Sequence, residues 1–209
     1  MKLKIAALAL FASASSLFGA STLNLRNFSS ATVGVPIVSS TGAAVDQTTL
    51  FANGGYFNTT MNFATATFTD IRSAFVSIDV SPLTGGTRSG LFTGQTFNGA
   101  LPVGFAGKDA YIVVANNTDF SQATLFAVFN SGAVFTAPDS FGNSAQTIDG
   151  ISTGSVVFGT VRSVTTQPTG LTGASFANGV VLVPTNVPEP SAALLGVIGA
   201  LGLLRRRRN

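Results

Sequence analysis

The 209-residue sequence contains no cysteine, no histidine and no tryptophan, and only 9% of its residues are charged. The absence of thiols and imidazoles excludes disulfide scaffolds, Cys/His zinc sites, thiol nucleophiles and histidine general bases. Because 45% of the residues are hydrophobic, disorder of the highly charged, low-hydropathy kind is excluded for most of the chain. The chain has enough residues, and enough of them apolar, to form one domain with a sizeable hydrophobic core.

The few charges are concentrated at the two ends of the chain. Lys2, Lys4 and residues 205–208 supply six of the eleven basic residues. Between Ser21 and Pro190 five basic residues stand against eight acidic ones, which gives a net charge of −3. The overall charge of +3 therefore belongs to the ends, and a nucleic-acid-binding body is disfavoured.

The N-terminal segment has the pattern of a secretory signal peptide. Two lysines within Met1–Lys4 precede an apolar run at Ile5–Phe11, and small residues follow as far as Ala20. We expect residues 1–20 to act as the signal and the mature chain to begin between Ser15 and Thr22. The alternative, an N-terminal core helix, lacks the polar face that such a helix carries.

The C-terminal segment has three parts, which are a Pro-Glu-Pro motif, an uncharged apolar stretch and an arginine cluster. They comprise Val187, Pro188, Glu189 and Pro190, then residues 191–204, then Arg205, Arg206, Arg207 and Arg208. As a helix, the 13 apolar residues Ala192–Leu204 would extend about 20 Å, short of a bilayer core of ~30 Å. The arginines keep this end cytoplasmic and leave the body outside, which indicates export with a temporary membrane anchor.

This ending resembles the PEP-CTERM sorting signal of Gram-negative bacteria, over residues 187–208. The resemblance implies recognition by an exosortase, a membrane-embedded cysteine transpeptidase, and removal of the tail near Pro188–Pro190. It also implies transient residence in the inner membrane after passage through the secretion machinery and signal peptidase. Delivery to the cell surface or to an exopolysaccharide matrix would follow. The two prolines independently favour an extended, cleavable segment, and a plain C-terminal membrane anchor is the alternative.

The body, residues 21–186, has the pattern of strands separated by Gly/Asn turns. Expected strands cover Phe63–Thr69, Ala74–Val80, Tyr111–Val114, Leu125–Phe129, Ser155–Val164 and Val180–Val183. Expected turns lie at residues 53–55, 85–86, 98–99, 116–117, 130–132, 149–150 and 178–179. The pattern predicts an all-β fold, a single antiparallel β-sandwich or barrel-like domain flanked by the signal helix and a short C-terminal apolar helix. A β-solenoid is the alternative, without a repeat to support it. Sixteen phenylalanines outside the signal are expected to fill the core.

Candidate catalytic motifs in the body are weak. Residues 150–154 match G-x-S-x-G, but Ser152 has no histidine partner, so a turn is expected there. A Ser–Lys dyad would need Lys108, the only lysine of the body, and the Lys108-Asp109 pair more simply begins a strand. The aspartates are isolated, and Asp139–Asn143 lacks the dense acidic pattern of a calcium loop.

These observations predict an exported, non-enzymatic structural protein of the cell surface or extracellular matrix, without a catalytic, cofactor or metal site. The residues expected to matter are those of sorting, at Val187–Pro190, and of membrane orientation, at Arg205–Arg208. A secreted polysaccharide-binding module is the main alternative, and a hydrolase is a third.

Overall fold

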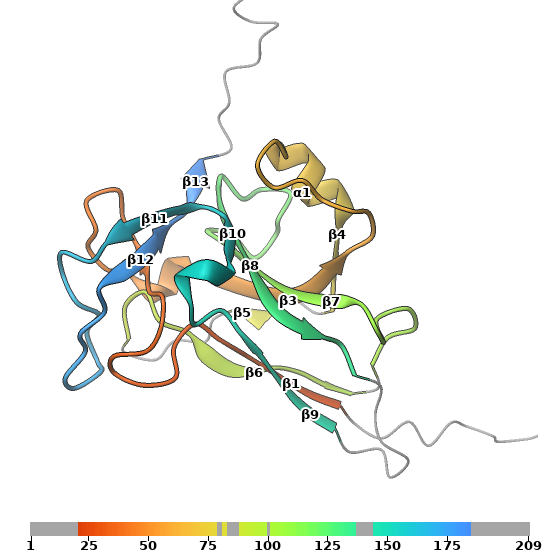
Figure 1. Cartoon of the computed structure of the whole chain (residues 1–209), viewed down its shortest axis with the longest axis horizontal. Helices are drawn as coiled ribbons and strands as arrows, with labels where there is room; N and C mark the ends of the chain where they lie inside the picture. Colours follow the sequence, from red (N-terminus) through yellow and green to blue (C-terminus); the bar gives the residue numbers. More distant parts are fainter. Residues whose placement is uncertain (1–20, 79–80, 83–87, 100, 137–143, 185–209) are drawn as a thin grey trace, which may run out of the picture.

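A computed structural model describes residues 21–78, 81–82, 88–99, 101–136 and 144–184 (Figure 1). The segments expected to be the signal peptide and the sorting tail lie outside these residues, as do Val187–Pro190 and Arg205–Arg208. In chain order the elements are β1 (Ser21–Arg26), β2 (Ile37–Val38), η1 (Gln47–Thr49), β3 (Phe51–Phe57), α1 (Phe68–Ala74), β4 (Phe75–Ser77), β5 (Ser81–Pro82), β6 (Thr93–Gly99), β7 (Asp109–Ala115), β8 (Leu125–Val134), β9 (Ser144–Asp149), η2 (Thr153–Ser155), β10 (Val156–Phe158), β11 (Thr160–Ser163), β12 (Asn178–Val181) and β13 (Val183–Pro184).

The strands form three sheets, which confirms the predicted all-β class. A seven-stranded sheet has the order β10-β8-β7-β3-β4, with β13 beside β8 and β5 beside β3. The two smaller sheets have the orders β6-β1-β9 and β11-β12-β2. The prediction of purely antiparallel pairing is wrong for two pairs, because β1 runs parallel to β9 and β12 runs parallel to β2. Among the helices of the described residues, none has the length and apolarity needed to cross a bilayer.

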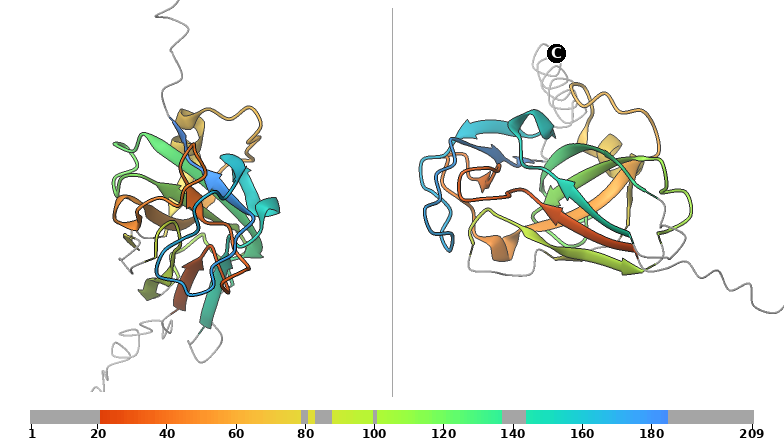
Figure 2. Two further views of the ribbon diagram at one scale, coloured as in Figure 1. Left: turned by 90° about the vertical axis from the view of Figure 1, so that its left-hand side faces the viewer. Right: turned by 60° about the horizontal axis from the view of Figure 1, so that its bottom comes forward.

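The seven-stranded sheet forms the middle layer of the domain. The sheet of β1, β6 and β9 lies against one face, and α1 with its flanking loops lies against the other (Figures 1 and 2). Along β7, Ala110, Ile112 and Val114 belong to the core shared with β1, whereas Val113 and Ala115 belong to the core beneath α1. Strand β7 is therefore buried on both faces, which explains why its sequence is a continuous apolar run.

Most of the phenylalanines are core residues, as predicted. Seven are almost completely buried, namely Phe28, Phe92, Phe105, Phe126, Phe129, Phe135 and Phe176. A second group is only partly buried and packs around α1 and the end of β3, namely Phe57, Phe63, Phe68, Phe75, Phe120 and Phe158. This second group leaves aromatic surface accessible on one side of the sheet.

Several Gly/Asn pairs that were predicted to be turns lie inside strands instead. Asn53, Gly54 and Gly55 form the centre of β3, where a Cβ at Gly55 would stand 2.3 Å from the Val76 carbonyl oxygen. Asn178-Gly179 begins β12, and Asn98-Gly99 ends β6. The glycines of β3 allow close packing and not chain reversal, because Gly54 faces side chains of β1 in the next sheet and Gly55 faces the adjacent strand β4.

The turn predicted at residues 130–132 is an irregularity within β8. Tyr111 pairs with Asn130 and Asp109 pairs with Val134, so the register between β7 and β8 shifts between these pairs. Gly132 lies within the shift and has a φ of +70°, which glycine adopts without steric cost. Bends follow β7 at residues 116–117, as predicted. The turn predicted at residues 149–150 is wrong, because Asp149 is the last residue of β9 and Gly150 continues from it without a turn. Residues 85–86 lie outside the described part of the chain.

The strand predicted at Phe63–Thr69 is wrong, because the segment is a loop that leads into α1. Thr67 is the N-cap of this helix and exchanges hydrogen bonds with Asp70 in a capping box. The strand predicted from Ala74 is reduced to β4, since Ala74 is the last residue of the helix. The strands predicted at Tyr111–Val114 and Leu125–Phe129 are confirmed. That at Ser155–Val164 is confirmed with an interruption at Gly159, and that at Val180–Val183 is divided at Leu182 into β12 and β13, which belong to different sheets.

Two buried asparagines have opposite hydrogen-bonding environments. The side-chain amide of Asn27 donates to the carbonyls of Val35 and Gly90 at 3.0 and 2.9 Å, and its oxygen accepts from the Phe92 N–H at 2.7 Å. The side chain of Asn53 is equally buried but makes no hydrogen bond to any described residue. The first asparagine joins three separate segments, whereas the second carries an uncompensated desolvation cost.

We predict that Asn27→Ala lowers the free energy of unfolding by about 3 kcal/mol, because it leaves the buried Val35 carbonyl and Phe92 N–H without their partner, while the Gly90 carbonyl keeps only its bond from the Ile37 N–H. Urea unfolding of the purified protein measures this change. As a matched control, Asn178→Ala removes an exposed amide and should change stability by less than about 0.5 kcal/mol. Equal effects of the two variants would show that the Asn27 hydrogen bonds do not stabilise the fold.

We predict that Asn53→Val leaves stability unchanged or raises it by about 1 kcal/mol, because an unpaired buried amide is replaced by a β-branched apolar side chain of similar size. The same urea titration tests this prediction. A loss of more than about 2 kcal/mol would contradict it and would indicate that the amide is paired.

Candidate functional site

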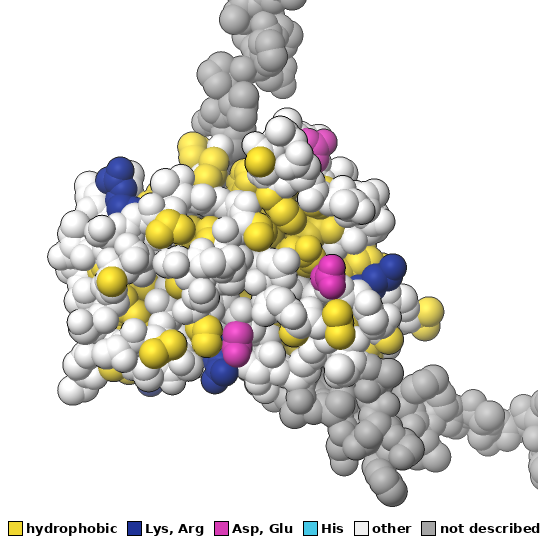
Figure 3. Space-filling view, in the orientation of Figure 1, with side chains coloured by type: hydrophobic (Ala, Val, Ile, Leu, Met, Phe, Trp, Pro, Cys, Tyr) yellow, Lys and Arg dark blue, Asp and Glu magenta, His cyan; other side chains and the backbone are white. Residues whose placement is uncertain are grey.

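Charge does not mark a functional site on this domain. The charged side chains lie scattered over the face seen in Figure 3. Among the described residues one ion pair is present, between Arg26 and Asp149 on the paired strands β1 and β9, with 2.9 Å between Nη2 and Oδ2. The candidate site is instead marked by the shape of the surface and by the polar groups that line it.

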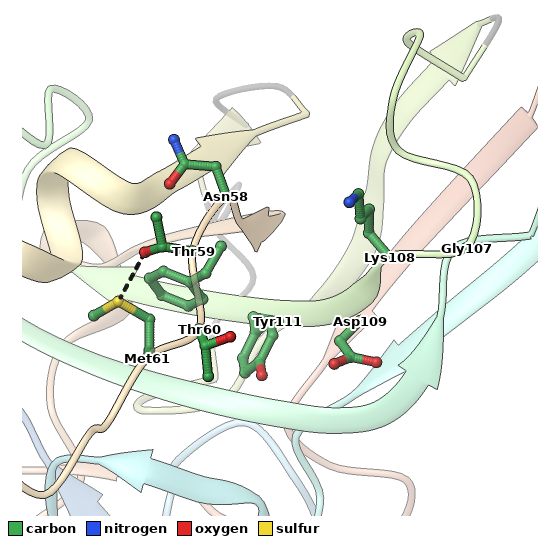
Figure 4. A pocket seen from close by; sticks show the side chains of 9 residues that line it. Asn58, Thr59, Thr60, Met61, Gly107, Lys108, Asp109 and Tyr111 are labelled. Carbon is green, nitrogen blue, oxygen red and sulfur yellow. Dashed lines mark hydrogen bonds between the residues drawn. The ribbon is translucent and has the colours of Figure 1, made fainter.

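A polar cleft of about 350 Å³ opens where β3 ends and β7 begins. One wall is the loop after β3, with Asn58, Thr59, Thr60 and Met61. The other wall consists of Gly107, Lys108 and Asp109, and the rings of Phe57 and Tyr111 lie between the two walls (Figure 4). The cleft thus combines two aromatic rings with amide, hydroxyl, ammonium and carboxylate groups.

The first wall is held in place by backbone hydrogen bonds at both ends. The N–H of Asn58 donates to the carbonyl of Ala74 at the end of α1, at 2.9 Å. Farther along, the N–H of Ala66 donates to the Asn62 carbonyl at 2.8 Å, and Thr67 caps the helix. The Thr59 hydroxyl also donates to the Met61 sulfur at 3.8 Å. The loop is therefore fixed in the folded protein, which makes the wall a preformed surface.

The second wall is fixed by its pairing with Phe135. The N–H of Gly107 donates to the Phe135 carbonyl, and the Phe135 N–H donates to the Lys108 carbonyl, both at 2.8 Å. Gly107 has a φ of +78°, a left-handed conformation that places Lys108 and Asp109 at the start of β7. Both side chains are exposed, so they extend from a rigid backbone into solvent beside the cleft.

The aromatic rings between the walls form a packed group. Tyr111 contacts Phe57 edge-to-face at 4.9 Å between ring centroids, and Phe63 lies 5.2 Å from Phe57 and 5.8 Å from Tyr111. Tyr111 pairs with Gly55 across β7 and β3, and the missing side chain at Gly55 gives the Phe75 ring room to approach. Partial burial, and secondarily the negative charge of Asp109, raises the pKa of Tyr111, so its phenol stays protonated at neutral pH.

Four polar side chains at the cleft have no hydrogen-bond partner among the described residues. They are the amide of Asn58, the hydroxyls of Thr60 and Tyr111, and the carboxylate of Asp109. The hydroxyl of Thr59, in contrast, is bonded to the Met61 sulfur. The one nearby cation, Lys108, lies 5.9 Å from the ring of Tyr56. The formal charges of Lys108 and Asp109 cancel, which leaves a cleft of neutral overall charge.

Two other hollows are less suited to specific polar binding. One of about 500 Å³ lies on the far side of the loop at residues 58–61 and extends to α1, where Asp70 is already engaged by Thr67. The other, about 420 Å³, is largely apolar and lies between the sheet edges near Leu125, Leu182 and Pro184. Neither combines exposed rings with several unpartnered polar groups.

The structure does not assemble the catalytic groups considered from the sequence. Ser152 is the N-cap of η2 and its hydroxyl accepts from the Gly154 N–H at 3.1 Å, which confirms the expected turn. Lys108 immediately precedes β7, as expected, and makes no hydrogen bond to Ser152. Within the described ranges no group of three or more acidic residues is placed to hold a metal ion. Asp139–Asn143, the weak calcium candidate, is outside those ranges.

Sequence reasoning missed the cleft because its residues come from segments about fifty positions apart. Asn58-Thr59-Thr60 carries no strand or catalytic signal, and Lys108-Asp109 predicts only the beginning of a strand. The one local signal is that both polar stretches lie close to an aromatic residue of a strand. Asn58 directly follows Phe57, the last residue of β3, and Asp109 lies two positions before Tyr111 in β7. Only the pairing of β3 with β7 brings the two together.

Comparison of the chain with protein-family models, with curated proteins and with solved structures finds no match.

We predict that acid weakens the attachment of the first wall. Hydrogen bonds from Thr67 lower the pKa of Asp70, so the capping box stabilises the fold above about pH 4 and is lost as pH falls through the Asp70 pKa. Asp70→Asn should therefore lose less stability than the wild type between about pH 5 and pH 3 in urea titrations. Asp46 and Asp119 also have lowered pKa values, but both proteins contain them, so they contribute equally to the loss of stability in acid of the wild type and the variant. Identical acid sensitivity of the two proteins would contradict the prediction.

Proposed function

We propose that this chain is an exported protein of the cell surface or extracellular matrix, sorted and cleaved through a C-terminal PEP-CTERM signal. The observation that carries the proposal is the order of three features at the end of the sequence, namely Pro188-Glu189-Pro190, an uncharged apolar stretch and Arg205–Arg208. An exosortase would be the processing partner, and signal peptidase would remove residues 1–20 after secretion. The inner membrane would hold the precursor only until the tail is cleaved.

The folded body is compatible with removal of both ends. Its three hydrophobic cores are built from residues between Leu23 and Leu182. The start of β1 and the end of β13 lie on opposite sides of the domain (Figure 1). In this proposal the three sheets act as one sandwich-like unit over residues 21–186, and this unit is the mature protein.

The body is proposed to be structural and non-enzymatic. The sequence provides no histidine or cysteine, and Ser152 is bound within its own turn. The low charge and the layered core suit a stable domain that persists outside the cell. The cysteine-free sequence also makes its folding independent of disulfide formation in an exported location.

A polysaccharide-binding module is the second candidate function, and the cleft between β3 and β7 favours it. That cleft offers the accessible aromatic ring that such a module requires, from Tyr111 rather than from tryptophan. The two candidates are compatible, because a matrix protein gains retention from binding a matrix polymer.

We predict that Glu189→Ala and Pro190→Ala, tested separately in cells that contain an exosortase, trap most of the protein in the membrane fraction without changing its fold. The reason is that each change alters the proposed recognition motif and leaves the body untouched. Immunoblots of membrane and released fractions measure the effect. Thr185→Ala, outside the motif, is the matched control and should be released normally. Normal release of both motif variants would contradict the proposal.

A further inference from the structure

We propose that the cleft between β3 and β7 is a binding site for a neutral saccharide, one or two pyranose units of a glycan chain. The site consists of the Tyr111 ring with Asn58, Thr60 and Asp109 around it, and Lys108 lies at its rim with its ammonium 5.9 Å from the Tyr56 ring (Figure 4). This inference rests on the second candidate function and deepens it, because it names the class of ligand and the residues that would bind it; it does not depend on sorting and export.

The rings supply the surface on which a sugar packs. A pyranose has a face of C–H groups, and an aromatic ring that is partly exposed beside polar groups matches that face. Tyr111 is held by edge-to-face contact with Phe57 at 4.9 Å between ring centroids, and Phe63 contacts both rings. The aromatic surface therefore needs no rearrangement before a ligand binds, which reduces the entropic cost of association.

The polar groups match the hydroxyls of a sugar in number and kind. Asn58 offers both a donor and an acceptor, Thr60 and Tyr111 offer hydroxyls, Asp109 offers acceptors and Lys108 offers donors. Asn58, Thr60, Tyr111 and Asp109 make no hydrogen bond to another described side chain, so a ligand would not have to displace an internal partner. Backbone hydrogen bonds fix both walls that carry these groups, at Ala74 and at Phe135.

Other ligand classes fit the cleft less well. A phosphate or a nucleic acid requires excess positive charge, whereas Lys108 is offset by the adjacent Asp109. A divalent metal prefers several oxygen ligands including carboxylates, and Asp109 is the one carboxylate of the cleft. A drug-like apolar ligand or a hydrophobic peptide requires a mainly apolar lining. At about 350 Å³ the cleft is near the lower end of the ~300–1,000 Å³ typical of ligand sites, which suits one or two sugar units.

The test measures binding of defined oligosaccharides to the purified full-length chain in detergent. The neutral probes are maltohexaose, cellohexaose, laminarihexaose, xylohexaose and chitohexaose. Hexagalacturonate is the anionic comparison. Isothermal titration and saturation-transfer NMR measure the affinity and the contact. We expect at least one neutral probe to bind with a Kd between about 10 μM and 1 mM.

Variants connect that binding to the cleft. Asn58→Ala and Thr60→Ala change exposed side chains at one wall, and each should weaken binding about ten-fold, the loss of about one hydrogen bond. Tyr111→Phe keeps the ring and should weaken binding by a similar factor, whereas Tyr111→Ala should abolish it. Because Tyr111→Ala also removes core packing, the two exposed wall variants decide the outcome if this variant does not fold.

Matched controls lie on the sheet of β11, β12 and β2. Asn178→Ala and Thr160→Ala make the same chemical changes at exposed positions outside the cleft and should bind like the wild type. The proposal is overturned if no neutral probe binds, if hexagalacturonate binds more tightly than every neutral probe, or if the wall variants bind as tightly as the controls. Tail processing plays no part in this assay. A negative binding result would therefore not contradict the sorting proposal, and unprocessed tails in cells would not contradict a positive binding result.

Discussion

Burial of the β7–β8 pair on both faces is the constraint on which the rest of the structure depends. Alternate residues of β7 enter two different cores, Ile112 and Val114 toward β1 and Val113 and Ala115 toward α1. Strand β8 does the same with Phe129 on one side and Phe126 on the other. A pair of this kind requires a layer on each face, so the small sheet of β1, β6 and β9 and the aromatic region around α1 follow from it.

The candidate site lies where this two-sided burial ends. Asp109 is exposed, Ala110 is buried, and Tyr111 is half-buried, so the first residues of β7 pass from solvent into the core. On the α1 face the covering layer consists of a loop and a short helix instead of a complete sheet. The rings of Phe57 and Tyr111 therefore remain partly accessible, and the polar groups of the two adjoining loops surround them. The cleft is a consequence of incomplete coverage combined with rigid loop ends.

The sequence predicted the fold class and the buried central strands well, because a continuous apolar run such as Tyr111–Val114 is a strong local signal. It failed where the use of a residue depends on distant neighbours. Gly54 and Gly55 indicate a turn locally, yet they lie inside β3 because Leu23, Leu25 and Phe75 occupy the space beside them. The helix α1 was missed because it is only seven residues long, and its one clear signal, the Thr67–Asp70 capping box, lay within a β-branched segment. The cleft could not be predicted, because it depends on the pairing of β3 with β7 across about fifty residues.

The folded body lies between two terminal segments that are proposed to be removed, and the proposed export depends on the sequences of these two ends. The most direct measurement of this central claim is the intact mass, with sequencing of the terminal peptides, of the protein collected outside the cells that produce it. The account predicts an N-terminus between Ser15 and Thr22 and a C-terminus between Pro188 and Ser191. A polypeptide that still begins at Met1 and still carries Arg205–Arg208 would contradict it.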